Sequence, residues 1–340
     1  MESTNLMTIH NWPIYGHDWA VEHLRKGLAN RRIRHAYLIT GPESVGKDTL
    51  ARAFAQALNC TQADEAARPC GECHACKLIA GGNHPDLLYT ELDSNTGALK
   101  IEEVRAVTGR LALKPFEARY RIAIFRNFDH ARGQAQDALL KTLEEPPPQA
   151  LLILLAASAD ALLPTITSRS QVIPLRPVAA DAVRDILIAH QGAAPEQADV
   201  LAGLCGGRIG WAIRALEDPD LLEQRERALS LLENVLDVTR AKRFDLADDL
   251  SKDKLALYPL LELWQSYWRD VLLMCENAPV PPANRDRRDQ IERLSARLST
   301  EEALTALQAT RATLRNLSMN LNLRLALEVM FLDYPGLRKA

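Results

Sequence analysis

The 340-residue sequence predicts an α/β domain built on a parallel sheet, followed by helical domains, and three observations support this fold class. From about residue 15 to residue 175, short apolar segments alternate with segments of helical periodicity, as in a parallel sheet flanked by helices. After Pro174 and Pro177, helical patterns alone continue. Only 5% of residues are aromatic while Ala and Leu are abundant, which favours a helix-rich chain. A length of 340 residues is too great for one typical core and predicts two or three domains.

The predicted strands are short apolar runs bounded by turn residues. They cover Ala36–Thr40, Leu87–Glu91, Arg121–Phe125 and Leu151–Ala156, with Gln171–Leu175 as a candidate fifth strand. Helical periodicity predicts helices between these strands, over Lys47–Asn59, Ile101–Lys114 and Gln134–Glu145. The last of these helices must end at Pro146–Pro148.

The rest of the chain is predicted to be helical. Short helices broken by Pro195, Gly203 and Gly206–Gly207 indicate a small helical domain over residues 177–218. Longer amphipathic helices over residues 219–340 are expected to pack as a bundle. They are predicted over Leu221–Val238, Tyr258–Cys275, Arg287–Leu298, Thr300–Leu317 and Leu321–Leu332.

Charge and hydropathy argue against several classes of protein. A net charge of −3 is unlike that of a small DNA-binding protein coated in positive charge. The first ten residues lack the basic start and apolar run of a signal peptide. The longest apolar stretch, Ala150–Ala157, is too short to span a bilayer. We therefore expect a soluble, cytoplasmic protein without a membrane partner.

A glycine-rich loop follows the first predicted strand and opens a predicted helix. Its sequence, GPESVGKDT from Gly41 to Thr49, has the spacing of a phosphate-binding loop. Gly41 and Gly46 let backbone N–H groups wrap phosphate oxygens, and Lys47 reaches the outer phosphates. A glycine-rich turn formed by chance would not also supply this lysine.

Two positions depart from the pattern of an ATPase. The residue after the lysine should carry a hydroxyl that coordinates Mg²⁺, but it is Asp48, and Thr49 lies about 100° further around the helix. The third strand should lead into acids that hold Mg²⁺ and polarise water, but it leads into Arg126 and Asn127. Asp129 is interpreted as the cap of the next helix. We expect no hydrolysis here, and nucleotide binding stays open.

Four of the six cysteines are clustered, at Cys60, Cys70, Cys73 and Cys76. Their spacing suits tetrahedral thiolate coordination of Zn²⁺, with a redox pair or an iron–sulfur cluster as the competing interpretations. Four sulfur ligands leave no open coordination position, so zinc at this site is expected to be structural.

Several motifs resemble the clamp-loader subunits of bacterial DNA polymerase III, which belong to the AAA+ superfamily. They are RIRHAYL from Arg32, ALLKTLEEPP from Ala138, LPTITSRS from Leu163 and NLNLRLALE from Asn320, together with the phosphate loop and the cysteine cluster. The resemblance covers most of the chain from Trp12 onward. The residues after the third strand favour the delta-prime branch over the gamma/tau ATPase subunits.

This resemblance implies an AAA+ domain over residues 1–176 with a zinc module at 60–76, a helical lid over 177–218 and a collar over 219–340. It also implies a hetero-pentamer with gamma/tau and delta subunits, which opens the ring-shaped sliding clamp and closes it on primed DNA. The DNA-directed polymerase reaction, a nucleotidyl transfer, belongs to the whole holoenzyme. A catalytically active, gamma/tau-like ATPase with a variant metal site is the alternative.

The resemblance further assigns Arg169, within Ser168-Arg169-Ser170, as a finger that stabilises charge on ATP bound by the neighbouring subunit. The alternative is an arginine that pairs with a local carboxylate or with helix carbonyls. Arg208 and Trp211 lie near the position of a phosphate-sensing arginine in active relatives, and we assign them no role.

Overall fold

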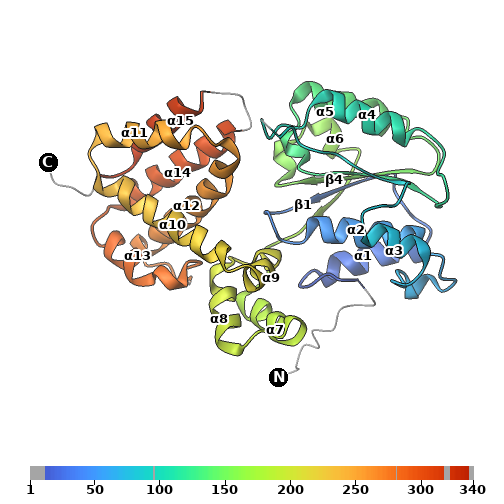
Figure 1. Cartoon of the computed structure of the whole chain (residues 1–340), viewed down its shortest axis with the longest axis horizontal. Helices are drawn as coiled ribbons and strands as arrows, with labels where there is room; N and C mark the ends of the chain where they lie inside the picture. The colour runs from blue at the N-terminus through green and yellow to red at the C-terminus, as the bar shows by residue number, and fades with distance from the viewer. Residues whose placement is uncertain (1–11, 95, 281, 318–321, 337–340) are drawn as a thin grey trace. The chain divides into compact units, whose positions relative to one another are not determined.

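We describe the chain from a computed structural model, in which residues 12–94, 96–280, 282–317 and 322–336 are placed. The chain divides into two compact units (Figure 1). The first unit contains Met1–Gly192 and Gly207–Trp211, and the second contains Ala193–Gly206 and Ala212–Ala340. Among the placed residues, no helix is both long enough and apolar enough to cross a membrane.

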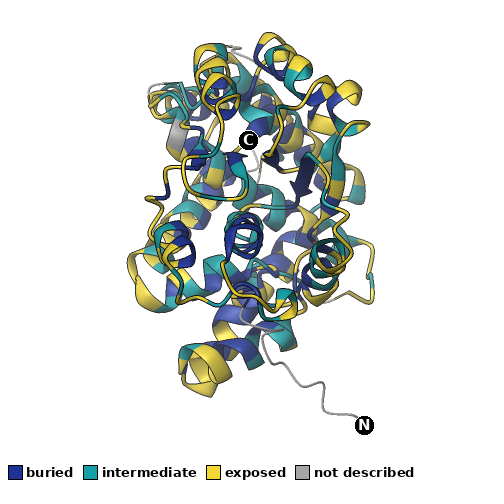
Figure 2. Cartoon of the chain, turned by 90° about the vertical axis from the view of Figure 1, so that its right-hand side faces the viewer, coloured by how far each residue is buried: buried dark blue, intermediate teal, exposed yellow. Residues whose placement is uncertain are grey.

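The first unit is built on one five-stranded parallel sheet. Its strands lie in the order β2-β3-β4-β1-β5, and every neighbouring pair is parallel. Figure 2 shows strands of this sheet coloured as buried, and every residue of β1 and β4 is buried. Both faces of a parallel sheet are covered by crossover helices, so its strands read as continuous apolar runs. The strands span β1 (Ala36–Thr40), β2 (Leu87–Tyr89), β3 (Arg121–Phe125), β4 (Ala150–Ala156) and β5 (Gln171–Pro174).

Helices cover the sheet on both faces, and alternate strand residues point to each side. Tyr37 and Ile39 of β1 belong to the core beneath α1 (Asp18–Ala29), α2 (Lys47–Asn59) and α3 (His74–Ala80). Ala36 and Leu38 belong to the opposite core, beneath α4 (Ile101–Leu111), α5 (Gly133–Glu144) and α6 (Pro164–Thr167). The remaining elements of this unit are η1 (Glu65–Ala67), η2 (Phe128–His130), η3 (Ala159–Ala161) and α7 (Ala180–Gln191).

The second unit is helical, and its core gathers Trp264, Trp268, Phe331 and Tyr334. The buried Arg243 fastens the end of the last helix, because its guanidinium donates to the carbonyl oxygens of Phe331, Tyr334 and the next residue, at 2.7–2.8 Å. Its helices are α8 (Pro195–Leu204), α10 (Asp220–Asp237), α11 (Arg240–Leu250), α12 (Lys254–Cys275), η4 (Arg285–Arg287), α13 (Arg288–Ser295), α14 (Thr300–Leu317) and α15 (Leu323–Asp333); α9 (Ile209–Glu217) begins in the first unit and continues into the second.

The predicted fold class is confirmed, with local differences. Helices α1 and α3 were not predicted, and β2 and α4 end two and three residues earlier than predicted. Helix α11 was not predicted, because its buried face carries Arg243 and Ala247 instead of an apolar stripe. Helix α12 begins one turn before Tyr258, since the Asp253 carboxylate accepts the N–H of Ala256 in its first turn. Helix α15 begins at Leu323, and the predicted start at residue 321 lies outside the described residues.

Candidate functional site

The predicted phosphate loop joins β1 to α2, and both of its glycines are required by the backbone. Gly41 has φ +148°, and a Cβ atom there would lie 2.5 Å from the carbonyl oxygen of Leu175. Gly46 has φ +114° and directly precedes α2. Side chains are strained in such conformations, so glycine is needed at both positions. The loop and the helix that begins at Lys47 therefore form at the residues predicted from the sequence.

Lys47 and several main-chain carbonyl groups of the loop are bonded to the protein itself. The Lys47 ammonium donates to the carbonyl oxygens of Gly41 and Pro42, at 2.6 and 2.8 Å. From outside the loop, the buried His17 ring contacts the carbonyl oxygen of Val45 at 2.9 Å, and the Gly210 N–H donates to the Ser44 carbonyl at 2.8 Å. Any bound phosphate must therefore compete with the loop's own carbonyls for the ammonium group.

The two positions that depart from an ATPase are in contact with each other. Asp48 and Arg126 lie 78 residues apart in the sequence. Nevertheless, Asp48 Oδ1 accepts from Arg126 Nε at 2.7 Å, and Oδ2 accepts from Arg126 Nη2 at 3.3 Å. Arg52 Nε lies 2.9 Å from the same carboxylate, and the Arg126 guanidinium stacks 4.2 Å from the ring centre of Tyr89. The carboxylate that replaces the metal-binding hydroxyl is thus held by two cations, and the two departures form one ion-paired group.

The interpretation of Asp129 as a helix cap is wrong. Its Oδ2 accepts the N–H of Ala157, just past β4, at 3.1 Å. The N-cap residue of α5 is Arg132, which makes no side-chain cap. The short helix η2 separates β3 from α5 and carries Asp129 towards β4 instead. Asn127 has φ +47° and begins this turn, while Thr49 lies half-buried in the first turn of α2.

The four clustered cysteines meet at one point in the first unit. Their sulfur atoms all lie within 4.8 Å of one another, and Cys60 Sγ lies 3.9 Å from Cys73 Sγ. A tetrahedral zinc site with Zn–S bonds of 2.3 Å places its sulfurs about 3.8 Å apart. The Cys70 N–H points to Cys60 Sγ and the Cys73 N–H to Cys70 Sγ, each at 3.4 Å. The spacing and these N–H donors fit four thiolates around one dication.

The thiols of this cluster differ in acidity. Burial raises the pKa of Cys60 and of Cys76. Burial also acts to raise the pKa of Cys73, but hydrogen bonds from Thr61 and Cys76 outweigh it and lower that pKa to about 6. Several thiolates packed this closely repel one another without a cation between them, so full deprotonation of the cluster requires bound metal.

Arg169 lies just past α6 and has two local partners. Its Nη2 lies 3.0 Å from Glu144 Oε1 at the end of α5, and its Nη1 donates to the Thr165 carbonyl at 3.1 Å. Its side chain is 38% exposed and that of Glu144 is 53% exposed. Such an exposed ion pair contributes only about 0–1 kcal/mol. The guanidinium can therefore exchange Glu144 for a stronger anion at little cost.

Gly210, in the segment 207–211, lies against the phosphate loop. The bond from Gly210 to Ser44 brings the segment against the phosphate loop, and a Cβ atom on Gly210 would lie 2.9 Å from the Ser44 carbonyl oxygen. Arg208 accepts the N–H of Trp211 through its main-chain carbonyl at 2.9 Å. Sequence reasoning missed this contact, because no local pattern links Gly210 to the loop.

Several known proteins are similar to this chain in sequence. The family described as DNA polymerase III, delta subunit, matches residues 16–179. DNA polymerase III subunit delta' of Pseudomonas aeruginosa is 32% identical over 234 residues, which cover 68% of this chain and 66% of that protein. Subunit delta' of Bacillus subtilis is 29% identical over 253 residues, covering 73% and 75%. The chain belongs to the delta-prime family of DNA polymerase III clamp-loader subunits.

Other relatives of this delta-prime family member are longer proteins. DNA polymerase III subunit tau/gamma of Haemophilus influenzae is 36% identical over 156 residues. The matched part covers 46% of this chain and only 22% of that relative. The membership and the parallel sheet together confirm the AAA+ fold that the sequence motifs implied.

Proposed function

We propose that the chain acts in the clamp loader as a subunit that does not hydrolyse ATP at its own phosphate loop. In this role it holds one structural Zn²⁺ through Cys60, Cys70, Cys73 and Cys76, and it supplies Arg169 to the ATP site of a neighbouring gamma/tau subunit. It assembles with gamma/tau and delta subunits into a hetero-pentamer that opens the sliding clamp and closes it on primed DNA.

The ion pair between Asp48 and Arg126 is the main support for a site without hydrolysis. Mg²⁺ beside a nucleotide needs an oxygen ligand at the start of α2 and an acid after β3. Here the first position is a carboxylate held by Arg52 and Arg126, and the second is Arg126 itself. Two guanidinium charges beside the metal position repel a dication. An active ATPase with a variant metal site would have to separate Asp48 from both arginines.

The exposed, weakly paired guanidinium of Arg169 supports its proposed action in a neighbour's site. A triphosphate carries more negative charge than Glu144, so it competes well for the guanidinium. An arginine finger acts by stabilising charge that develops on the transferred phosphoryl group. Arg169 would therefore exchange its ion pair with Glu144 for the nucleotide when a neighbouring subunit with bound nucleotide is in place.

The test is ATP turnover of the reconstituted loader, stimulated by clamp and primed DNA. Arg169→Ala is expected to reduce turnover at the site it completes by on the order of 10³-fold. Lys47→Ala in this chain is expected to leave turnover within about twofold, because this loop hydrolyses nothing. A large loss with Lys47→Ala, and none with Arg169→Ala, would overturn the proposal.

Glu144→Gln is the matched control for Arg169→Ala. It removes the local ion pair but keeps the guanidinium that the proposal needs. If Arg169 only braces α5, the two variants will lose turnover equally. If Arg169 acts on the neighbour's ATP, Glu144→Gln will retain turnover close to that of the wild type.

Metal analysis tests the proposed cofactor. The purified chain is expected to carry about one zinc per molecule, and Cys73→Ser/Cys76→Ser is expected to lose it. Bound iron with visible absorbance would favour a cluster instead, and full zinc retention by the double variant would refute this ligand set.

A further inference from the structure

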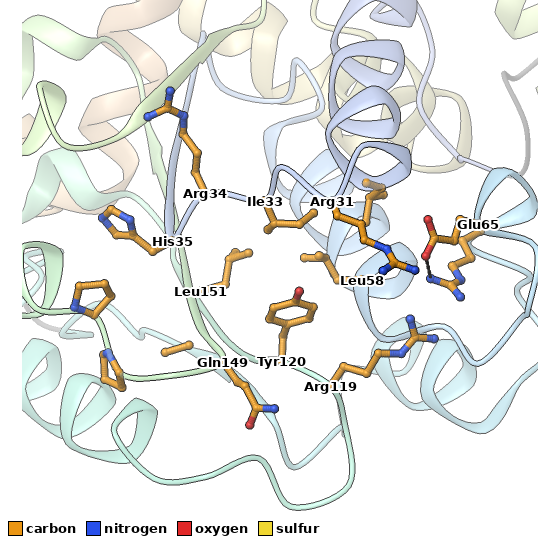
Figure 3. Close-up of a pocket in the computed structure, with 15 residues that line it drawn as sticks. Arg31, Ile33, Arg34, His35, Leu58, Glu65, Arg119, Tyr120, Gln149 and Leu151 are labelled. Carbon is orange, nitrogen blue, oxygen red and sulfur yellow. Dashed lines mark ion pairs between the residues drawn. The ribbon is translucent and has the colours of Figure 1, made fainter.

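A pocket of about 520 Å³ opens at the amino end of the sheet, where β1, β3 and β4 begin (Figure 3). The phosphate loop follows the carboxyl end of β1, so this pocket lies at the other end of the strands. Helix α2 runs between the two regions. Its 13 residues, rising 1.5 Å each, span about 20 Å. The pocket is therefore separate from the phosphate loop and from any nucleotide bound there.

The floor of the pocket is apolar. Ile33, Leu58 and Leu151 line it from three different segments of the chain. Figure 3 shows the ring of Tyr120 among these side chains, with Gln149 beside it. A flat ligand can therefore lie against aliphatic carbon and an aromatic face, and meet a side-chain amide at its edge.

One side of the pocket carries an excess of positive charge. Arg31 and Arg119 extend in Figure 3 towards the side where Glu65 lies, and Arg68 reaches the same carboxylate at 3.6 Å. Three guanidinium groups face this one carboxylate, which leaves about two positive charges. Within the part of the chain that the structure describes, the Arg31 guanidinium has no carboxylate partner.

Hydrogen bonds fix the walls that carry these groups. The buried Arg68 donates from Nε to the Gln62 carbonyl at 2.7 Å, and Arg119 donates to the Cys60 carbonyl. The buried Asn59 amide holds Tyr120 from both sides, accepting its N–H at 3.0 Å and donating to its carbonyl at 3.1 Å. A ligand would thus meet a site that is already formed, which favours binding.

We propose that this pocket binds a nucleotide through its phosphate group, with the phosphate on the guanidinium groups and the base against the apolar floor. A phosphomonoester carries −1.5 to −2 charges at neutral pH, which matches the excess charge better than one carboxylate does. Arginine forks fit phosphate oxygens with paired hydrogen bonds, and the volume suits a ligand of this size. The nucleotide is either free or the 5′-phosphorylated end of a DNA strand.

The first test measures binding to the purified full chain in buffer without added Mg²⁺, because the proposed contacts to the phosphate group involve no metal. The probes are AMP, adenosine, and a short 3′-labelled strand with a 5′ phosphate or a 5′ hydroxyl. In at least one of the two pairs, the phosphorylated probe is expected to bind at least about tenfold more tightly than its partner. The pairs are AMP against adenosine, and the 5′-phosphate strand against the 5′-hydroxyl strand. AMP alone identifies a free nucleotide, and the strand alone identifies a strand end. Equal binding with and without phosphate overturns the proposal.

The second test uses variants that keep the side-chain stems. Arg31→Gln/Arg119→Gln is expected to weaken binding of the phosphorylated probe at least about tenfold. Arg32→Gln/Arg110→Gln removes the same charge outside the pocket and is expected to change binding less than about threefold. Equal losses in both double variants would show non-specific attraction and overturn the proposal. Loss of binding with Lys47→Ala would place the ligand in the phosphate loop and overturn it as well.

Discussion

At the carboxyl end of the sheet Asp48 and Lys47 are bonded to other groups of the protein, whereas around the pocket at the amino end guanidinium groups outnumber carboxylates. Asp48 is held by Arg52 and Arg126, and Lys47 donates to carbonyl oxygens of its own loop. At the other end, Arg31 and Arg119 line an open pocket with one carboxylate, Glu65. The charges of the glycine-lysine motif are thus already paired, and the excess guanidinium charge at the amino end is where we propose that an anion binds.

The largest effect is expected at the amino end, from Asp86→Asn. This wholly buried carboxylate accepts three backbone N–H groups, of residues 116–118, at 2.7, 2.9 and 3.0 Å, and so holds the segment that carries Arg119. Asparagine loses the charge and one acceptor oxygen, so we expect a loss of about 3 kcal/mol in unfolding free energy. Urea unfolding measures it, with the exposed Asp137→Asn as the control.

The loss of unfolding free energy caused by Asp86→Asn is expected to depend on pH. Burial acts to raise the pKa of Asp86, but the N–H groups of Glu117, Phe116 and Ala118, and the charge of Arg121, outweigh it and lower the pKa. A lowered pKa stabilises the fold above the ordinary value of about 4, and this stabilisation is lost as pH falls through the folded pKa. The gap between wild type and Asp86→Asn should therefore close below pH 4. A gap that stays constant down to pH 2 would contradict this account.

A second variant exchanges the charge pattern at the carboxyl end. Asp48→Thr/Arg126→Asp restores a hydroxyl on α2 and an acid after β3, so we expect ATP to bind at least about tenfold more tightly with Mg²⁺ than in the wild type. Calorimetry measures the affinity with and without Mg²⁺. Asp48→Thr alone supplies no acid, and its ATP affinity should not depend on Mg²⁺. If the double variant binds ATP no more tightly than the wild type, a feature other than Asp48 and Arg126 limits ATP binding at this loop.

The smallest effects compare the stability contributed at the two ends. Asp48→Asn removes the charge from a pair whose side chains are 35% and 42% exposed, and it should cost about 0.5–1 kcal/mol. Arg31→Gln should change the unfolding free energy by less than about 0.5 kcal/mol, since this exposed side chain has no ion-pair partner among the described residues. The reverse order in thermal or urea unfolding would show that Arg31 is structural.

Local patterns in the sequence were enough to predict much of the fold. The five strands, the helix from Lys47 to Asn59 and the need for Gly41 and Gly46 all follow from residues close together in the chain. The cysteine cluster also follows from spacing, and the four sulfurs do meet. In these cases the periodicity or the motif directly expresses the backbone geometry.

Contacts between distant segments were beyond such reasoning. Asp48 and Arg126 looked like two separate defects, because nothing local shows that they pair. The amino-end pocket is assembled from residues before β1, at the end of α2, and before β3 and β4, and its arginines look like an ordinary solvated surface. Arg243 is similar, since a charged residue in a helix without an apolar stripe gives no sign that it is buried.

Helix α2 connects several of these features through its two ends. It starts with Lys47 in the phosphate loop, and it finishes with Asn59, which clamps Tyr120, immediately before Cys60. A continuous helix of this length moves as a stiff strut, because its hydrogen bonds allow little change in length. A displacement of Lys47 along the helix axis would therefore be transmitted to Cys60 and to the pocket wall, about 20 Å away. The metal ion that we propose for the cluster would resist this displacement at the far end of the helix.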